Sequence, residues 1–165
     1  MRGSRLSVQI LFLAITTSFF APDVCLAAQP VSSEQDLLVG TWQLDVAKSR
    51  YTPGPPPRSE TRTYVRDADG MKGTIRRRHD NGRDEVIEYR ADFDHEYPVM
   101  GTEAYDTIRL KRIDARTAEA VLSHAGRVFG TARRVVSEDG RTLTITFRQE
   151  DRGILESNVA VFRKQ

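Results

Sequence analysis

The chain has 165 residues, a formal net charge of +2, 39% hydrophobic residues and 29% charged residues. That length indicates a single domain, and the near-balanced charge argues against a nucleic-acid-binding protein. The one cysteine, Cys25, falls inside a predicted leader, so we expect a mature protein without disulfides, thiolate metal ligands or a cysteine nucleophile.

Residues 1–28 have the pattern of a secretory signal peptide. Two arginines precede an apolar run over residues 6–21, a proline follows that run, and small residues at 25–28 provide a cleavage zone. An uncleaved membrane anchor is the alternative, but the polar residues inside the run and the proline after it favour cleavage. We therefore expect a periplasmic or secreted protein, with no stable membrane insertion after cleavage.

Residues 29–38 form a polar lead-in, and residues 39–165 form the predicted folded domain. Its opening stretch contains Gly40, which permits close backbone approach at a strand start. Two residues later comes Trp42, the only tryptophan, which brings a large apolar side chain to the predicted core. The following residues 45–58 are rich in proline, which predicts an extended connection rather than a pair of helices.

From residue 59 onward, strand-like segments alternate with tight turns. Asp69-Gly70, Asn81-Gly82 and Asp139-Gly140 are strong two-residue hairpin signals. Helical periodicity is absent beyond the leader, so the pattern predicts an all-β, antiparallel up-and-down meander. The expected strands lie near residues 40–46, 60–67, 71–79, 84–92, 105–113, 117–124, 127–137, 141–149 and 154–163.

The composition favours a closed barrel over a two-sheet sandwich. A sandwich needs two clean apolar inner faces, whereas several predicted strands carry polar groups on both faces. A barrel wider than its side chains can fill tolerates a polar interior, and we expect about nine or ten strands. The same charges exclude the continuous apolar outer band of an outer-membrane barrel. If the first and last strands pair, Arg163 would lie across the Trp42 ring as a cation–π contact that secures the closure.

The chain also resembles a known superfamily. Gly40-Thr41-Trp42 near the start, with a basic residue in the last strand, resembles the calycin superfamily of lipocalins and fatty-acid-binding proteins. The mature chain is similar to short exported bacterial lipocalin-like proteins, through Trp42 to Ser49, Pro53 to Pro55, Tyr97 to Val99 and Leu110 to Asp114. The resemblance implies a closed lipocalin-like barrel with a small hydrophobic or amphipathic ligand in its cavity.

Three residues are candidate ligand contacts. Fatty-acid-binding proteins hold a ligand carboxylate with buried Arg and Tyr side chains, because a desolvated guanidinium–carboxylate pair is strong. Strand alternation places Arg77 with Ile75, Tyr89 with Ile87, and Arg133 with Phe129. If those three faces point inward, Arg77, Tyr89 and Arg133 would meet an anionic head group.

Other chemistry has little support in the sequence. The histidines His79, His95 and His124 lack metal-ligand spacing, and hydrolase or phosphate-binding motifs are missing. We therefore predict no metal, cofactor or catalytic residue. The expected function is an exported small-molecule-binding protein for a partly apolar ligand, either neutral or anionic. Two alternatives stay open: a cell-envelope scaffold without a ligand, and a barrel-based isomerase or hydrolase.

Overall fold

The computed structural model describes residues 36–67, 70–151 and 154–165. The predicted signal peptide and most of the polar lead-in lie outside these residues. Within them, no helix is long and apolar enough to cross a membrane. The elements are β1 (Gly40–Leu44), the 3-10 helix η1 (Val46–Lys48), β2 (Arg50–Thr52), β3 (Ser59–Asp67), β4 (Gly70–Arg78), β5 (Asp84–Ala91), β6 (Glu96–Met100), β7 (Thr107–Arg112), β8 (Thr117–His124), β9 (Arg127–Val136), β10 (Thr142–Asp151) and β11 (Ile154–Lys164).

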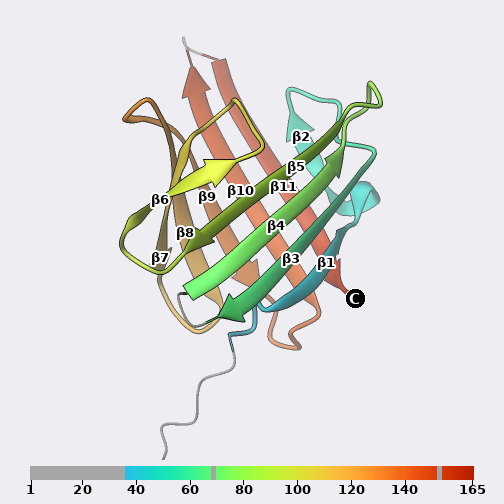
Figure 1. Cartoon of the computed structure of the whole chain (residues 1–165). Coiled ribbons are helices and arrows are strands. Elements are labelled where there is room, and N and C mark those ends of the chain that lie inside the picture. Colours follow the sequence, from blue (N-terminus) through green and yellow to red (C-terminus); the bar gives the residue numbers. More distant parts are fainter. Residues whose placement is uncertain (1–35, 68–69, 152–153) are drawn as a thin grey trace, which may run out of the picture. The chain divides into compact units, whose positions relative to one another are not determined.

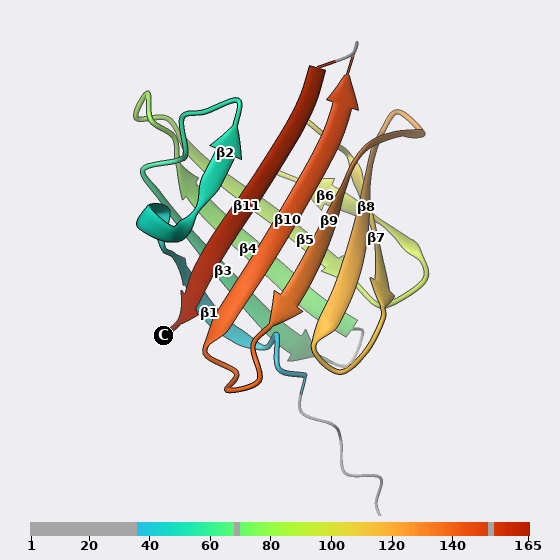
Figure 2. The same ribbon diagram turned by 180° about the vertical axis from the view of Figure 1, so that it is seen from behind.

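The strands form an antiparallel, up-and-down barrel, as the sequence predicted. Each strand from β3 to β11 pairs with the next along the chain, and β1 pairs with both β3 and β11, which closes the barrel. Figure 1 shows β3, β4 and β5 as one wall, and Figure 2 shows β8 to β11 as the wall behind it. Because β3 to β11 are each paired with the next strand along the chain, this part of the fold needs only direct connections between consecutive strands.

Strand β2 is an addition to the ten-stranded barrel. It pairs with residues 157–159 of β11, whereas β1 pairs with residues 162–164 of the same strand. The chain therefore leaves β11 after β1, makes the single turn of η1, and returns to the same edge, as Figure 2 shows. The proline-rich segment follows β2. As predicted, this connection between β1 and β3 has no pair of helices.

All nine predicted strands are present, and two short ones were missed. Strand β6 contains Pro98, which cannot donate a hydrogen bond to a ladder and so weakens the strand signal. Strand β2 has three residues and ends directly before a proline-rich run. Both are shorter than the windows over which alternation can be recognised in a sequence.

The hairpin turns follow the predicted glycine positions where the structure describes them. Gly82 donates its backbone N–H to His79 O at 3.0 Å, and Gly140 donates to Ser137 O at 3.0 Å. Both glycines have positive φ angles, 85° and 67°, a region that favours glycine. These turns fix the registers of β4 with β5 and of β9 with β10.

The closure between β1 and β11 surrounds Trp42. This side chain has 0% exposure, and its indole Nε1 donates a hydrogen bond of 2.8 Å to Leu38 O. The cation over its ring is Lys164, with Nζ at 5.1 Å from the ring centroid. A Cβ added at Gly40 would lie 2.8 Å from Lys164 Cε, so this glycine leaves room for the lysine.

The expected contact between Arg163 and Trp42 is wrong. Trp42 pairs with Lys164 in the ladder, and Arg163 pairs with Gln43. Arg163 therefore lies on the opposite face of β11, where its Nη2 is 2.6 Å from Asp45 Oδ2. The Arg163 side chain thus binds Asp45, the residue that joins β1 to η1, and it does not cover the tryptophan ring.

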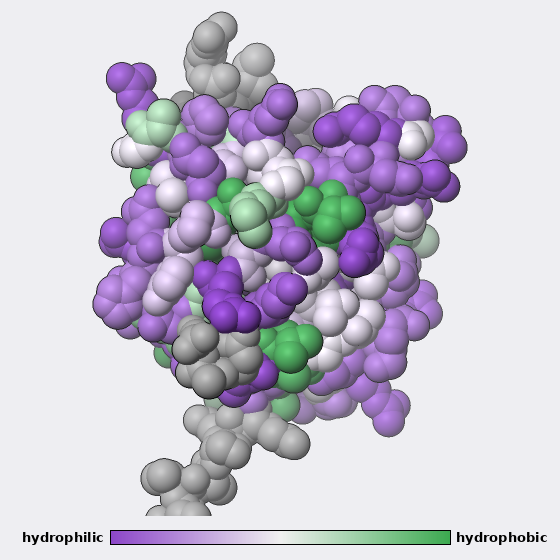
Figure 3. All heavy atoms as spheres, viewed as in Figure 1, coloured by the Kyte–Doolittle hydropathy of each residue, from purple (hydrophilic) through white to green (hydrophobic). Residues whose placement is uncertain are grey.

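The face of the molecule seen in Figure 3 is predominantly hydrophilic. In the view of Figure 3, apolar residues appear as small separate patches among charged ones. The apolar core lies inside the barrel, around the fully buried Trp42, Tyr64, Leu143 and Phe162. Function is therefore best sought in the interior rather than on a broad exposed apolar face.

Candidate ligand-binding cavity

The barrel encloses a cavity of about 380 Å³, a size typical of small-molecule sites. Apolar side chains from several strands line it, including Ile75, Ile87, Ile108 and Ile145. Aromatic rings line it as well: Phe129 lies between Tyr105 and Phe147, with ring centroids 5.9 Å and 6.2 Å away. The proline-rich segment reaches the same cavity through Pro53 and Pro55.

Three cross-strand rows on β3, β4 and β5 form one wall of this cavity. Strict alternation turns every second residue of each strand inward, and the registers place them side by side. The first row is Glu60, Arg77 and Glu85. The second is Arg62, Ile75 and Ile87, and the third is Tyr64, Gly73 and Tyr89.

The first row is built around the buried carboxylate of Glu60, which has 1% exposure. Its Oε1 accepts a hydrogen bond of 2.5 Å from Arg62 Nε, and its Oε2 accepts one of 2.6 Å from Arg77 Nε. Burial by itself would raise the pKa of Glu60, but the two guanidinium groups outweigh it and lower the pKa below the ordinary value. Glu60 is therefore ionised at neutral pH.

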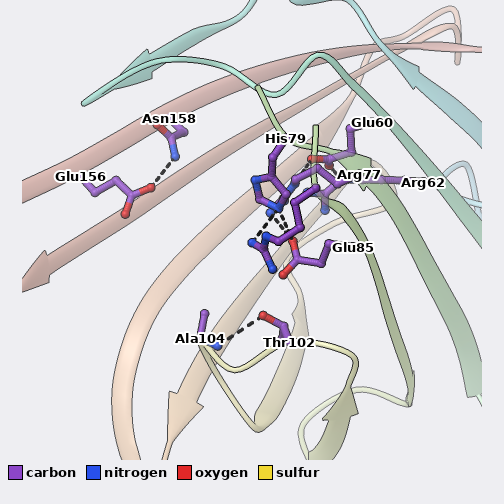
Figure 4. Close-up of polar contacts among 10 residues, drawn as sticks. Glu60, Arg62, Arg77, His79, Glu85, Thr102, Ala104, Glu156 and Asn158 are labelled. Atoms are coloured by element: carbon purple, nitrogen blue, oxygen red, sulfur yellow. Dashed lines mark hydrogen bonds and ion pairs between the residues drawn. The ribbon is translucent and has the colours of Figure 1, made fainter. Parts of the chain in front are cut away.

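This ion-pair network continues toward the end of the barrel that holds the β4–β5 hairpin. Arg77 Nη1 donates to Glu85 Oε2 at 3.2 Å, and that oxygen lies 3.1 Å from His79 Nε2. Arg83 Nη2 lies 3.0 Å from the same histidine nitrogen. Figure 4 shows Glu60, Arg77, His79 and Glu85 gathered together, with Asn158 and Glu156 on a separate strand. The carboxylates of Glu60 and Glu85 thus already have cationic partners.

The third row brings two tyrosines together across a glycine. A Cβ at Gly73 would lie 2.4 Å from Tyr89 Cζ, so the Tyr89 ring occupies the space that any side chain on residue 73 would fill. Both hydroxyl groups are buried, and neither has a hydrogen-bond partner among the described residues. Burial raises the pKa of Tyr89. For Tyr64, the fields of Arg134 and Arg62 outweigh burial and lower the pKa.

Arg134, on β9, faces these two rings from the other wall. Its guanidinium carbon lies 5.6 Å from the Tyr64 ring centroid and 5.8 Å from that of Tyr89. The residue has 4% exposure and lines the cavity. Its Nε and Nη1 atoms have no hydrogen-bond partner within residues 36–67, 70–151 and 154–165. A buried cation without a carboxylate partner is costly, which makes Arg134 the unusual group of this interior.

The structure places two of the three predicted ligand contacts in the cavity and the third on the outer face. Arg77 and Tyr89 line the cavity. The expected inward position of Arg133 is wrong: this side chain is on the outer face, where its Nη1 donates to Glu119 Oε1 at 2.7 Å. The adjacent residue Arg134 points inward in its place. Arg77 has two carboxylate partners, whereas the buried Nε and Nη1 of Arg134 have no hydrogen-bond partner among the described residues.

A β-bulge explains the error at Arg133. Leu122 pairs with Gly130, but the next residue of β8, Ser123, pairs with Val128, so Phe129 is an extra residue in β9. An extra residue reverses the inward–outward alternation on its two sides. Phe129 and Arg134 consequently both line the cavity, although an odd interval in the sequence would put them on opposite faces of a regular strand.

Sequence reasoning also missed Glu60, Arg62 and Tyr64, although a signal for them was present. These residues lie at alternate positions in β3 and share a face. An acidic and a basic residue on the inner face of a predicted strand would have indicated a buried ion pair. The signal was obscured because the outward residues Thr61 and Thr63 are also polar, which leaves no contrast between the two faces.

A second hollow, of about 500 Å³, lies on the outer wall beside β5 and β6, and it is lined by exposed groups such as Lys72, Arg90 and Met100. These two strands share only the pairs Glu88 with Met100 and Tyr89 with Val99. Because this hollow is an exposed surface groove, the enclosed cavity is the better candidate site.

Comparisons with known proteins and a search for metal ligands add no competing assignment. The sequence matches no protein-family model, and no curated protein matches it significantly. Among the described residues, no group of three or more His, Cys, Asp or Glu side chains is placed to hold a metal ion. The functional argument therefore rests on the geometry of the cavity.

Proposed function

We propose that this protein binds and carries a small, partly apolar anionic molecule inside its barrel. The observation that carries this proposal is the buried guanidinium of Arg134, whose Nε and Nη1 have no hydrogen-bond partner among the described residues although it lines the cavity beside the Tyr89 ring. A ligand carboxylate placed there would supply the missing counter-ion, and the nearby Tyr89 hydroxyl would donate to it. A desolvated pair of this kind is much stronger than the same pair in water.

The cavity supports a carrier better than it supports the two alternative functions. A scaffold needs no cavity of this size, and a filled barrel would serve it equally well. An acid–base enzyme needs a carboxyl group free to exchange a proton near neutral pH. Glu60 does not meet that need, because Arg62 and Arg77 occupy both of its oxygens and lower its pKa.

The proposed setting of this carrier is an exported one. The leader pattern of residues 1–28 supports a periplasmic or secreted location. The closed ten-stranded barrel, with its early glycine and tryptophan, supports a calycin-like protein of lipocalin type. Because the connection between β1 and β3 has no helical lid, we expect ligand exchange without a lid-opening step.

The adjacent arginines of β9 provide the test. Displacement of a fluorescent fatty acid should be measured on delipidated wild type and on the Arg134→Met and Arg133→Met variants. We expect Arg134→Met to weaken binding of the acid by about 2–5 kcal/mol, because the buried head group loses its partner. Arg133→Met is the matched control, since its side chain is exposed and paired with Glu119.

A neutral ligand completes the test. The alcohol with the same chain should bind wild type more weakly than the acid, and Arg134→Met should leave alcohol binding nearly unchanged. Equal effects of the two substitutions, or equal binding of acid and alcohol by wild type, would show that Arg134 does not hold an anion. Thermal melts establish that both variants are folded.

A further inference from the structure

The charges that line the cavity leave a surplus of a single positive charge. Four arginines line it, Arg62, Arg77, Arg83 and Arg134, and so do three glutamates, Glu60, Glu85 and Glu156. With His79 neutral, four positive and three negative charges give a net lining charge of +1. Since the interior is poorly screened, a ligand charge that fails to match this surplus is penalised strongly.

The surplus is localised by the way these groups are paired. Glu60 occupies Arg62 and Arg77, and Glu85 holds Arg77 a second time. Arg83, near the hairpin end, contacts His79. Arg134 has neither a carboxylate nor any hydrogen-bond partner at its Nε and Nη1 atoms among the described residues. The position of Glu60 therefore decides how many buried guanidinium groups remain for a ligand.

We propose that Glu60 is a specificity-determining residue that restricts this cavity to ligands with one negative charge. The inference rests on the proposed function and names its ligand class: amphipathic monoanions such as carboxylates, sulfonates, sulfate monoesters or phosphate diesters. Phosphate monoesters and compact dicarboxylates are disfavoured in their doubly charged forms. The Glu60 carboxylate pairs with the guanidinium groups of Arg62 and Arg77, which a second negative charge on the ligand would need as partners.

Two physical effects produce this selection. The two arginines beside Glu60, Arg62 and Arg77, are already paired with it, so a second ligand charge placed next to them would find no free guanidinium. An unpaired buried charge is strongly unfavourable. It would also be repelled by Glu60, whose carboxylate cannot move to water because it is enclosed and held on both oxygens. Like charges held close together in a low-dielectric interior repel each other strongly.

A pair of ligands tests the inference on the unaltered protein. Dodecyl phosphate changes from a monoanion to a dianion as pH rises through its second pKa, about 6, whereas dodecyl sulfate stays a monoanion. Both are titrated below their micelle-forming concentrations at about pH 5 and about pH 8. We expect the affinity of the phosphate relative to the sulfate to fall at least about tenfold between these pH values.

The sulfate ligand removes the contribution of the protein's own titration. His79, which faces Glu85 and Arg83, is part of the cavity lining, so any change in the charge of the lining with pH acts on both ligands. Taking the ratio of the two affinities cancels that change. A ratio that stays constant, or rises with pH, overturns the restriction to monoanions.

Two variants assign the effect to Glu60. Glu60→Gln raises the lining charge to +2, since four arginines then face two glutamates. We expect its phosphate-to-sulfate ratio at about pH 8 to rise at least about tenfold above that of wild type. Glu60→Gln combined with Arg77→Gln returns the lining charge to +1 and should restore the wild-type preference. A ratio unchanged in Glu60→Gln assigns the selection elsewhere and overturns the role of Glu60.

The results of these binding experiments distinguish a failure of this inference from a failure of the proposed function. If wild type binds neither dodecyl ligand nor a fatty acid, the carrier proposal fails and the inference fails with it. If wild type binds all of them without regard to charge number, the carrier proposal stands and only the inference is overturned. If Glu60→Gln does not fold, the comparison of phosphate and sulfate on wild type still decides whether dianions are excluded.

Discussion

At the scale of single residues, Trp42 shows how one side chain secures the closure. Its ring is fully buried, its Nε1 is bonded to Leu38 O, and Lys164 lies over its face. Replacing a buried tryptophan with alanine typically costs about 3–5 kcal/mol. Because the ring lies where β1 meets β11, we expect Trp42→Ala to lower the free energy of unfolding by that amount, measured in urea.

The two basic residues near the end of β11 should behave differently. Trp42 is the only tryptophan, so intrinsic fluorescence reports on its surroundings directly. We expect Lys164→Met to change the emission of Trp42 and to cost about 0.5–2 kcal/mol, the range for a cation over an aromatic ring. Arg163→Met should leave the emission maximum unchanged. The opposite pattern would contradict the placement of Lys164 over the ring.

At single residues, the predictions from sequence failed where they had to decide which of two adjacent strand residues faces inward. The sequence interpretation predicted that a basic residue of the last strand would cover Trp42 if the barrel closed, and that an arginine of β9 would face the cavity if its side of the strand pointed inward. It selected Arg163 and Arg133, and in both cases the adjacent residue has that position. A one-residue change of register reverses the face of every side chain, and register depends on bulges and pairing partners that lie elsewhere in the chain.

At the scale of elements, the contact between β4 and β5 depends on a glycine. Gly73 lies in the middle of β4, where glycine weakens a strand, yet any side chain there would overlap the Tyr89 ring. We expect Gly73→Ala to lower stability by about 1–3 kcal/mol, as overpacked positions do. It should also weaken anionic ligand binding, because it displaces Tyr89 from its place beside Arg134.

A double substitution checks that the cause is this clash. Leucine at position 89 removes the ring atoms that lie closest to residue 73, so Gly73→Ala should cost clearly less in a Tyr89→Leu background. The comparison is a double-mutant cycle, in which residues in contact give non-additive effects. Additive losses would mean that Gly73 is required for the strand itself rather than for the tyrosine.

Element boundaries were predictable where alternation and turn chemistry coincided. The hairpins at Gly82 and Gly140 were predicted from their dipeptides, because a positive φ angle there favours glycine. Strands β2 and β6 were not, because both are short and are stabilised by a partner strand rather than by their own sequence. The bulge at Phe129 had no local signal, since it is defined by pairing with β8.

At the scale of the whole molecule, the interior is charged as well as apolar. The composition predicted a polar interior, and the structure places Glu60 at the centre of an ion-pair network that joins β3, β4 and β5. Breaking such a buried network by removing one partner is strongly destabilising, typically by about 3–5 kcal/mol. The stability of the barrel should therefore depend on the protonation of this carboxylate.

The direction of that dependence follows from the lowered pKa of Glu60 in the folded barrel. In the unfolded chain the carboxyl group titrates near its ordinary value of 4.5, so the ionised form is favoured by folding. Its stabilisation is fully present above pH 4.5 and is lost as pH falls through the lower, folded-state pKa. We expect urea midpoints of wild type to fall steeply over this acidic range.

Comparison with Glu60→Gln isolates this contribution, because the amide cannot titrate. At neutral pH the variant should be less stable than wild type, since the partly buried guanidinium groups of Arg62 and Arg77 lose their anion. As pH falls below 4.5, the difference in free energy of unfolding should narrow, because wild type then loses the same ion pairs by protonation. Glu103→Gln, at an exposed position, is the control and should follow wild type throughout. A gap between wild type and Glu60→Gln that stays constant with pH would mean that Glu60 stabilises the barrel through its shape and hydrogen bonds, and that its charge contributes little.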